Sequence, residues 1–217
     1  MKLYIGNKNY SSWSLRGWLA CKQAGLPFEE IVVPLYDDAW AKTRLQPEFQ
    51  PSAGKVPVLW DGEAVVWDSL AIIDWLADKT HRDRFWPKDP VACGLARSMA
   101  AEMHSGFLPL RREFSMNMRA RHTDVSVSPE AHQDAMRILT LWAEARARFG
   151  RGGPFLFGSF GAADIMFAPV VSRFETYGFK LPGFAQAYSD AILGHEWMAS
   201  WTEAALAEPW VIERFER

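Results

Sequence analysis

The chain lacks the residues that build disulfide frameworks and metal sites. Only two of its 217 residues are cysteine, Cys21 and Cys93, and they form no C-x-x-C pair. The five histidines show no H-E-x-x-H or comparable metal-binding spacing. We therefore expect no disulfide and no bound metal, and we interpret Cys21, which falls in an apolar helical segment, as a buried thiol.

Long apolar runs and an excess of one charge are missing as well. No uncharged apolar run approaches the about 20 residues that cross a bilayer, and Asp74 interrupts the longest candidate, 70–77. Residues 1–6 carry no signal-peptide core or cleavage site, and we interpret them as an opening strand. The net charge of −2 favours neither a nucleic-acid surface nor a membrane patch. We expect a soluble, reduced, cytoplasmic protein that binds neither nucleic acid nor membranes.

What the sequence does contain is a set of binding signals between residues 54 and 69. In the run 54–59 (GKVPVL), Pro57 interrupts a strand-like apolar stretch and gives up a ladder hydrogen bond. The backbone groups of the neighbouring Val56 are then free to bind a ligand. After a hairpin signal and a second apolar run, Asp68-Ser69 opens a helix whose free N–H groups suit a carboxylate. Together these features predict a site for a small peptide with a free amino-acid end.

The order of elements predicts an α/β domain over residues 1–79. Apolar residues repeat at helical spacing from Ser14 to Ala24, and Gly25 with Pro27 gives a standard helix exit. The other expected elements are strands at 3–5 and 28–35, a polar segment of weak helical pattern at 37–50, two strands around residues 61–62, and a helix at 69–77. Helix-joined early strands favour parallel pairing and the hairpin is antiparallel, so we expect a small mixed sheet.

The rest of the chain predicts a second, all-helical domain. Residues 80–90 are charged, contain two prolines and are typical of a linker. The run Ser128-Pro129-Glu130 is a clear helix start, with an N-cap serine followed by proline. Over 91–217 we expect helices at 91–121, 129–149, from 161 onward, 183–193 and 196–207.

On four motifs the chain resembles the cytosolic glutathione S-transferase family. The segment 51–57 (PSAGKVP) is similar to the family's loop into its cis-proline strand, and Asp68-Ser69 to its acid–serine pair. The segment 9–16 (NYSSWSLR) resembles the serine-rich start of helix 1 in the zeta-like, maleylacetoacetate isomerase group, and 161–165 (GAADI) the buried N-cap of the central helix. The resemblance spans nearly the whole chain and implies a serine-type bacterial member. It further implies a thioredoxin-like domain with a mixed four-stranded sheet, then an all-helical domain.

The chain departs from this family pattern at three places. Gly161 stands where a serine or threonine usually caps the helix, so we expect Asp164 to reach back to its N–H, with Phe160 and Ile165 as a hydrophobic staple. Trp13 replaces the cysteine of the zeta-like motif. The arginine that holds the isomerases' diacid substrate has no aligned counterpart, since Arg173 lies about one helical turn earlier.

The resemblance implies a glutathione site that activates the thiol. By alignment, Ser11 is the first candidate for the activating hydroxyl, Ser12 the second and Tyr10 the third. By residue type alone, the serines are also ordinary helix caps. The implied glutathione contacts are Ser11, Trp13, Val56 through its backbone, Asp68 and Ser69 at the γ-glutamyl end, and Lys42 and Lys55 at the glycyl carboxylate. Lys42 is the first candidate for this carboxylate and Lys55 the weaker one, and both are also compatible with exposed loop cations.

For the second substrate we expect a pocket between the domains that takes small hydrophobic electrophiles. His104, Phe107, Arg111 and Met116 recur there at roughly helical spacing, a pattern that an ordinary helix face also gives. Arg111 with its neighbour Arg112 would favour anionic compounds. The leading function is therefore a detoxifying glutathione transferase, which the resemblance implies is a homodimer. The alternatives are a zeta-type isomerase or dehalogenase, and a non-catalytic glutathione- or partner-binding protein.

Overall fold

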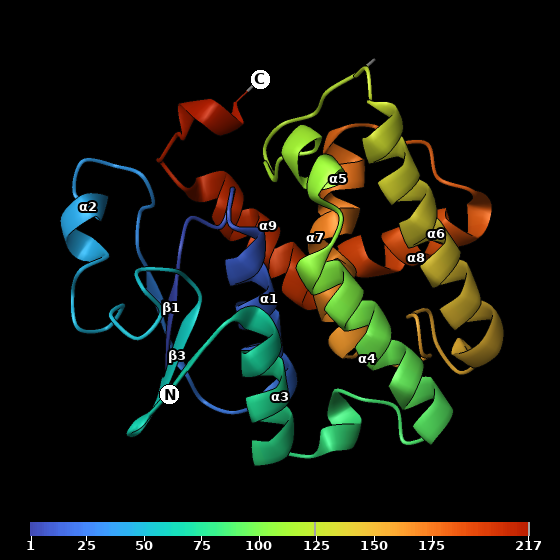
Figure 1. Ribbon diagram of the computed structural model, residues 1–217, viewed down its shortest axis with the longest axis horizontal. Helices are drawn as coiled ribbons and strands as arrows, with labels where there is room; N and C mark the ends of the chain where they lie inside the picture. The colour runs from blue at the N-terminus through green and yellow to red at the C-terminus, as the bar shows by residue number, and fades with distance from the viewer. Residues whose placement is uncertain (124, 217) are drawn as a thin grey trace.

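The computed structural model describes residues 1–123 and 125–216. The N-terminal part holds a four-stranded sheet in the order β2-β1-β3-β4 (Figure 1). Strand β1 (Lys2–Ile5) pairs parallel with β2 (Glu29–Val32) and antiparallel with β3 (Val58–Asp61), which pairs antiparallel with β4 (Ala64–Trp67). The predicted mixed sheet is therefore confirmed, although β2 is shorter than the expected strand at 28–35.

Helices α1 (Ser12–Ala24) and α3 (Ser69–Lys79) pack against each other beside the sheet, as Figure 1 shows. Helix α1 begins two residues before the predicted Ser14, because Ser11 takes the extended N-cap conformation and its side chain caps the helix. It ends as predicted at Gly25, whose φ of 67° is left-handed. Only one turn, α2 (Trp40–Thr43), forms within the polar segment 37–50.

The C-terminal part is helical, as predicted. A short helix η1 (Arg82–Arg84) lies in the connection from α3 to this part. The helices that follow are α4 (Pro90–Ser105), α5 (Leu108–Glu113), α6 (Pro129–Phe149), α7 (Ala162–Thr176), α8 (Gly183–Leu193), α9 (Glu196–Ala207) and the short η2 (Glu213–Phe215). No helix in the described ranges is long and apolar enough to cross a membrane.

The expected single helix at 91–121 is wrong. Helix α4 ends at Gly106, Phe107 adopts a left-handed φ of 61°, and only the six residues of α5 follow. Pro109 lies in the first turn of α5, where its missing N–H costs nothing, whereas inside a continuous helix it would remove a hydrogen bond. The chain therefore turns at 106–107 instead of continuing as one rod.

Helix α7 forms the centre of the molecule and joins its two parts. It packs against α1 of the N-terminal part and against α4 and α8 of its own part. Nearly all of its residues are buried, including Asp164 and Arg173. Asp164 accepts hydrogen bonds from the N–H groups of Gly161 (2.9 Å) and Leu156 (3.1 Å), which confirms the expected contact to Gly161. Burial raises the pKa of Asp164 to about 7, against the opposing effect of these hydrogen bonds.

The segment after α9 returns to the N-terminal part. The Glu208 carboxylate accepts hydrogen bonds from the N–H groups of Lys8 (2.6 Å) and Asn9 (3.1 Å). Arg119 donates to the carbonyl oxygens of Glu208 (2.9 Å) and Trp210 (2.7 Å). These contacts fix residues 208–216 as a strap over one side of the interdomain cavity.

Candidate functional site

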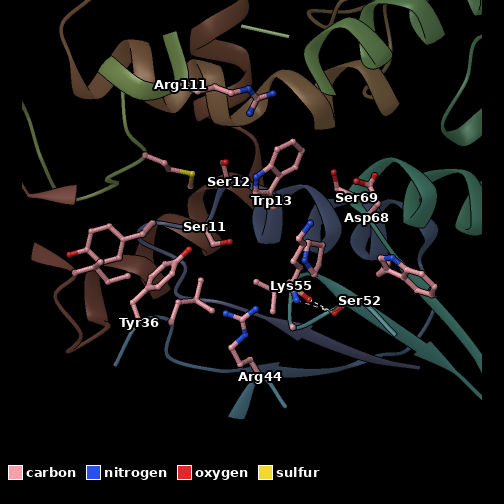
Figure 2. A pocket seen from close by; sticks show the side chains of 18 of the residues that line it. Ser11, Ser12, Trp13, Tyr36, Arg44, Ser52, Lys55, Asp68, Ser69 and Arg111 are labelled. Carbon is pink, nitrogen blue, oxygen red and sulfur yellow. Dashed lines mark hydrogen bonds between the residues drawn. The ribbon is translucent and has the colours of Figure 1, made fainter. Parts of the chain in front are cut away.

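A cavity of about 1020 Å³ opens between the two parts of the molecule. Its walls come from the start of α1, the loop before β3, the β4–α3 junction, the α4–α5 region and the strap 208–216. In Figure 2, Ser11, Ser12 and Trp13 lie in the middle of the view, with Arg111 above Trp13. Lys55 and Arg44 lie below them, and Asp68 and Ser69 lie to one side.

The two serines at the start of α1 line the cavity but have different hydrogen bonds. The Ser11 hydroxyl accepts from the N–H of Ser14 (3.2 Å) and donates to the Ser14 hydroxyl oxygen (2.8 Å). The Ser12 hydroxyl oxygen accepts from the Arg173 guanidinium (3.2 Å). Its own proton has no acceptor within the described parts of the chain. Ser11 is thus engaged in capping the helix, while Ser12 has a hydroxyl proton to donate.

Cationic groups surround Trp13 and Ser12. The guanidinium carbons of Arg16 and Arg111 lie 4.6 and 4.9 Å from the centroid of the Trp13 ring. Arg16 is fully buried, and its two terminal nitrogens have no hydrogen-bond partner among the described residues. Burial lowers the pKa of Arg111 to about 10 and that of Arg173 to about 9, which leaves both groups charged at neutral pH.

The loop before β3 presents a free backbone edge to the cavity. The Val56–Pro57 peptide bond is cis, and the N–H and C=O of Val56 form no hydrogen bond with the described residues. Ser52 holds the turn, since its hydroxyl accepts from the Lys55 N–H (3.1 Å) and donates to the Lys55 carbonyl (2.7 Å). Gly54 has a left-handed φ of 73°, and a Cβ there would lie 2.8 Å from the Arg44 side chain. Glycine at this position therefore lets the loop pack against Arg44.

The β4–α3 junction supplies a second polar corner. Asp68 caps α3 by accepting from the N–H of Leu70 (2.8 Å), and its other oxygen lies 3.2 Å from Nε2 of His104. Its φ of 74° is left-handed, which is uncommon for a residue other than glycine. The buried hydroxyl of Ser69 has no partner among the described residues. A buried hydroxyl without a partner costs free energy unless a ligand or water completes it.

The structure does not place every predicted site residue in the cavity. Ser11, Ser12, Trp13, Lys55, Val56, Asp68, Ser69, His104, Arg111 and Met116 line it. Lys42 is exposed on α2 and Phe107 is buried in the core, and neither is among the lining residues. Tyr10 lines the cavity, but its hydroxyl contacts Glu216 and accepts from Arg119 (3.0 Å).

Sequence reasoning missed several residues that line the cavity. Arg44 lines the cavity, whereas Lys42, the cation expected from the same segment of the chain, does not. Ile212 and Phe215 enter from the strap, and no local pattern in the sequence signals their approach. In the described part of the chain, no group of three or more histidine, cysteine, aspartate or glutamate residues is placed to hold a metal ion.

Two family models match consecutive parts of the chain. Residues 10–79 match "Glutathione S-transferase, N-terminal domain" and residues 124–205 match "Glutathione S-transferase, C-terminal domain". Glutathione S-transferase 1 of Dianthus caryophyllus is 28% identical over 90% of this chain and 88% of its own length. A probable maleylacetoacetate isomerase of Caenorhabditis elegans is 37% identical over 50% of this chain and 48% of its own.

Solved structures share the fold at lower identity. A glutathione transferase homolog from Burkholderia with bound glutathione has a TM-score of 0.68 at 21% identity, covering 95% of this chain and 98% of its own. Maleyl pyruvate isomerase, a bacterial zeta-class protein, has a TM-score of 0.70 at 21% identity, covering 98% and 100%. These likenesses confirm the predicted architecture, a thioredoxin-like domain followed by a helical one.

Proposed function

Because this chain belongs to the glutathione S-transferase family, we propose that it is a glutathione transferase whose interdomain cavity binds glutathione and activates its thiol. The proposal is supported chiefly by one observation. The free backbone edge of Val56, the unpartnered Ser69 hydroxyl and the hydroxyls at the start of α1 all line the same cavity. These are the groups needed to hold a tripeptide along its backbone, bind one carboxylate and stabilise a sulfur anion.

The proposed glutathione contacts follow the cavity from one end to the other. Val56 pairs its backbone with the cysteinyl residue as an added strand does. The Ser69 hydroxyl and the N-terminus of α3 take the γ-glutamyl carboxylate, and Asp68 lies at the amino group. Lys55, joined by Arg44, faces the glycyl carboxylate. Lys42 was the other candidate for this carboxylate, and its exposed position on α2 gives it no contact with the cavity.

The thiol is activated at the start of α1. A free thiol has a pKa of about 8.5, and lowering it to about 6.5 requires about 2.7 kcal/mol of preferential stabilisation of the thiolate. The N-terminal dipole of α1 supplies about 0.3–1 kcal/mol of this. A hydroxyl that donates to sulfur supplies a further part, and Ser11 and Ser12 are the candidates. Tyr10 has no part in this proposal, because its hydroxyl is engaged by Arg119 and Glu216.

The electrophile occupies the part of the cavity between Trp13, the α4–α5 region and the strap. Met116, Ile212 and Phe215 give it apolar walls, while His104 and Arg111 add polar groups. This lining suits small hydrophobic electrophiles. The second candidate function, a zeta-type isomerase or dehalogenase, is favoured by the 37% identity to the Caenorhabditis elegans relative over half of this chain.

We also propose that the protein is a cytoplasmic homodimer, as an extension of the family assignment. Trp75 of α3 and Val91 of α4 are 37% and 59% exposed and would be available to a partner surface. Light scattering coupled to gel filtration tests the dimer. A mass of one chain at micromolar concentration would contradict it.

The function is tested by calorimetry with glutathione together with turnover of an aryl halide and of maleylacetone. Saturable binding with aryl-halide conjugation supports the transferase. Turnover of maleylacetone without conjugation moves the assignment to the isomerase. Binding without either activity would support a glutathione-binding protein that is not an enzyme, and no binding would overturn the proposal altogether.

A further inference from the structure

Arg173 connects the centre of the helical part to the start of α1. It lies in the last turn of α7, lines the cavity and is only 6% exposed. Its guanidinium donates to the carbonyl oxygens of Phe114 and Arg111, and to the Ser12 hydroxyl oxygen at 3.2 Å. Within the described ranges, Ser12 is the only residue whose side chain accepts a hydrogen bond from Arg173. The guanidinium therefore forms a direct hydrogen bond with a hydroxyl of the proposed thiol site.

The charge of Arg173 is stabilised by hydrogen bonds to carbonyl and hydroxyl oxygens, but not by a carboxylate of the described residues. No ion pair joins it to a carboxylate within residues 1–123 and 125–216. The titratable groups acting on it are the cationic Arg111 of α5 and Tyr177 after α7, and Arg16 of α1 lies in the same cationic group. A buried cation without a counter-ion is costly, and an anion bound in the cavity would offset that cost.

The two serines differ in what this cation does to them. A hydroxyl that accepts a hydrogen bond from a cation becomes a stronger donor through its own proton. Ser12 is in that situation, whereas the Ser11 proton is directed to Ser14. We propose that Arg173 is a positioning residue that polarises the Ser12 hydroxyl, so that Ser12 donates the hydrogen bond that stabilises the glutathione thiolate. The thiol proton leaves to solvent, and no other bond changes.

This inference rests on the proposed function and names the residue pair that performs the activation. It decides between the two serines in favour of Ser12, and it adds a role for an arginine that does not align with the isomerases' substrate-binding arginine. It also explains why Arg173 pairs with no carboxylate among the described residues, since the bound thiolate supplies the negative charge.

The test is the ultraviolet difference spectrum of bound glutathione, which reports thiolate directly, in Ser12→Ala, Ser11→Ala, Arg173→Lys and Arg173→Gln. We expect about tenfold less thiolate at neutral pH in Ser12→Ala and Arg173→Gln, with partial recovery in Arg173→Lys. Ser11→Ala should reduce thiolate less than Ser12→Ala. The matched control is Arg151→Gln, which removes the same charge from an exposed position outside the cavity. Binding of S-methylglutathione, which has no thiol to ionise, checks that each variant keeps an intact site.

A double-mutant cycle tests whether Arg173 acts through Ser12, and it needs only Arg173→Lys if Arg173→Gln fails to fold. In the Ser12→Ala background, Arg173→Lys should change the thiolate fraction little. The same change in both backgrounds would overturn the inference, as would loss of thiolate in Ser11→Ala with retention in Ser12→Ala. Wild-type protein that binds no glutathione, or binds it only as the thiol, would instead overturn the proposed function.

Discussion

The two ends of helix α7 each carry a buried charged residue, and they differ in where their partners come from. Asp164 in the first turn accepts from the N–H groups of Gly161 and Leu156, which belong to the segment leading into the helix. Arg173 in the last turn donates to two carbonyl oxygens of its own helical part, but it also reaches Ser12 of the N-terminal part and faces the cavity. Both charges have the sign that the helix dipole favours at their end.

This difference separates a structural charge from a functional one. Asp164 completes the backbone hydrogen bonding of its own helix cap, so its removal should damage the fold. Arg173 and the Ser69 hydroxyl face the cavity and still lack, respectively, a counter-ion and a hydrogen-bond partner among the described residues. A change at Ser69 should therefore damage ligand binding more than stability. Arg173 also donates to two backbone carbonyl oxygens, so its removal should affect both ligand chemistry and stability.

The largest expected effect is that of Asp164→Ala. The N–H groups of Gly161 and Leu156 lose their acceptor, and each buried donor left unsatisfied costs about 1–3 kcal/mol. We expect the free energy of unfolding, measured by urea denaturation, to fall by about 3 kcal/mol or more. If the variant kept its stability but lost turnover, Asp164 would have a functional role like that of Arg173, and the distinction between the two charges would be wrong.

The pH dependence of stability sharpens the same point. The pKa of Asp164 is about 7 in the folded protein, above its ordinary value of 3.8, because burial disfavours the charge. The folded state therefore binds this proton more tightly than the unfolded state does. The resulting stability is present below about pH 4 and is lost as pH rises through about 7. Asp164→Asn, which cannot ionise, should flatten the urea-unfolding free energy across that window. If the unfolding free energy of Asp164→Asn changed with pH as steeply as that of the wild type, Asp164 would not be the cause of the pH dependence.

Ser69→Ala tests the opposite behaviour. The hydroxyl has no partner to lose within the described structure, so the melting temperature should stay the same or rise. The dissociation constant for glutathione should increase about tenfold, which corresponds to about 1.4 kcal/mol for a hydrogen bond to a carboxylate. Calorimetry measures the affinity, and Ser98→Ala on the exposed face of α4 is the control. A destabilised variant with normal affinity would contradict the assignment.

Ser11 caps helix α1, and two substitutions at this position measure what the cap contributes to stability. Ser11→Ala removes an N-cap and should cost about 1 kcal/mol, whereas Ser11→Gly should cost only a few tenths. Thermal unfolding of the two variants measures this difference. No loss of stability in either variant would mean that the Ser11–Ser14 contact does not stabilise α1.

The smallest effect is expected for the exposed lysines. Lys55→Ala should raise the KM for glutathione by a fewfold at low salt and by less at high salt, because exposed charges are screened. Lys42→Ala should leave KM unchanged, since Lys42 does not line the cavity. Steady-state kinetics at two salt concentrations measures KM for the two variants. A larger rise in KM for Lys42→Ala than for Lys55→Ala would contradict the prediction, because Lys42 could then contact the ligand only if α2 closed over it.

The parts of the fold that the sequence predicts are those set by local chemistry. Two apolar runs joined by the D-G turn predict the hairpin of β3 and β4. The helix predicted at 129–149 from its Ser128-Pro129 start matches α6 to its last residue, Phe149. The Gly161–Asp164 contact follows from capping chemistry alone. The break at 106–107 does not show in the apolar pattern because helical periodicity continues across it, and Pro109 is a local signal of it.

Site residues can be predicted where they belong to a short sequence motif. They cannot be predicted where segments far apart in the sequence come together. The loop before β3 and the Asp68-Ser69 pair, which both line the cavity, are predicted from the short motifs that contain them. The strap residues Ile212 and Phe215 reach the cavity only because Arg119 and Glu208 fix the segment, through contacts that join residues far apart in the sequence. The contact from Arg173 to Ser12 is of the same kind.

The most direct test of the account is a titration of wild-type protein with bound glutathione from about pH 5 to 9, followed by the thiolate difference spectrum. The account predicts a thiolate band that persists well below the free-thiol pKa of about 8.5. A band that disappears near that value, as it does for free glutathione, would contradict the claim that this cavity activates the thiol.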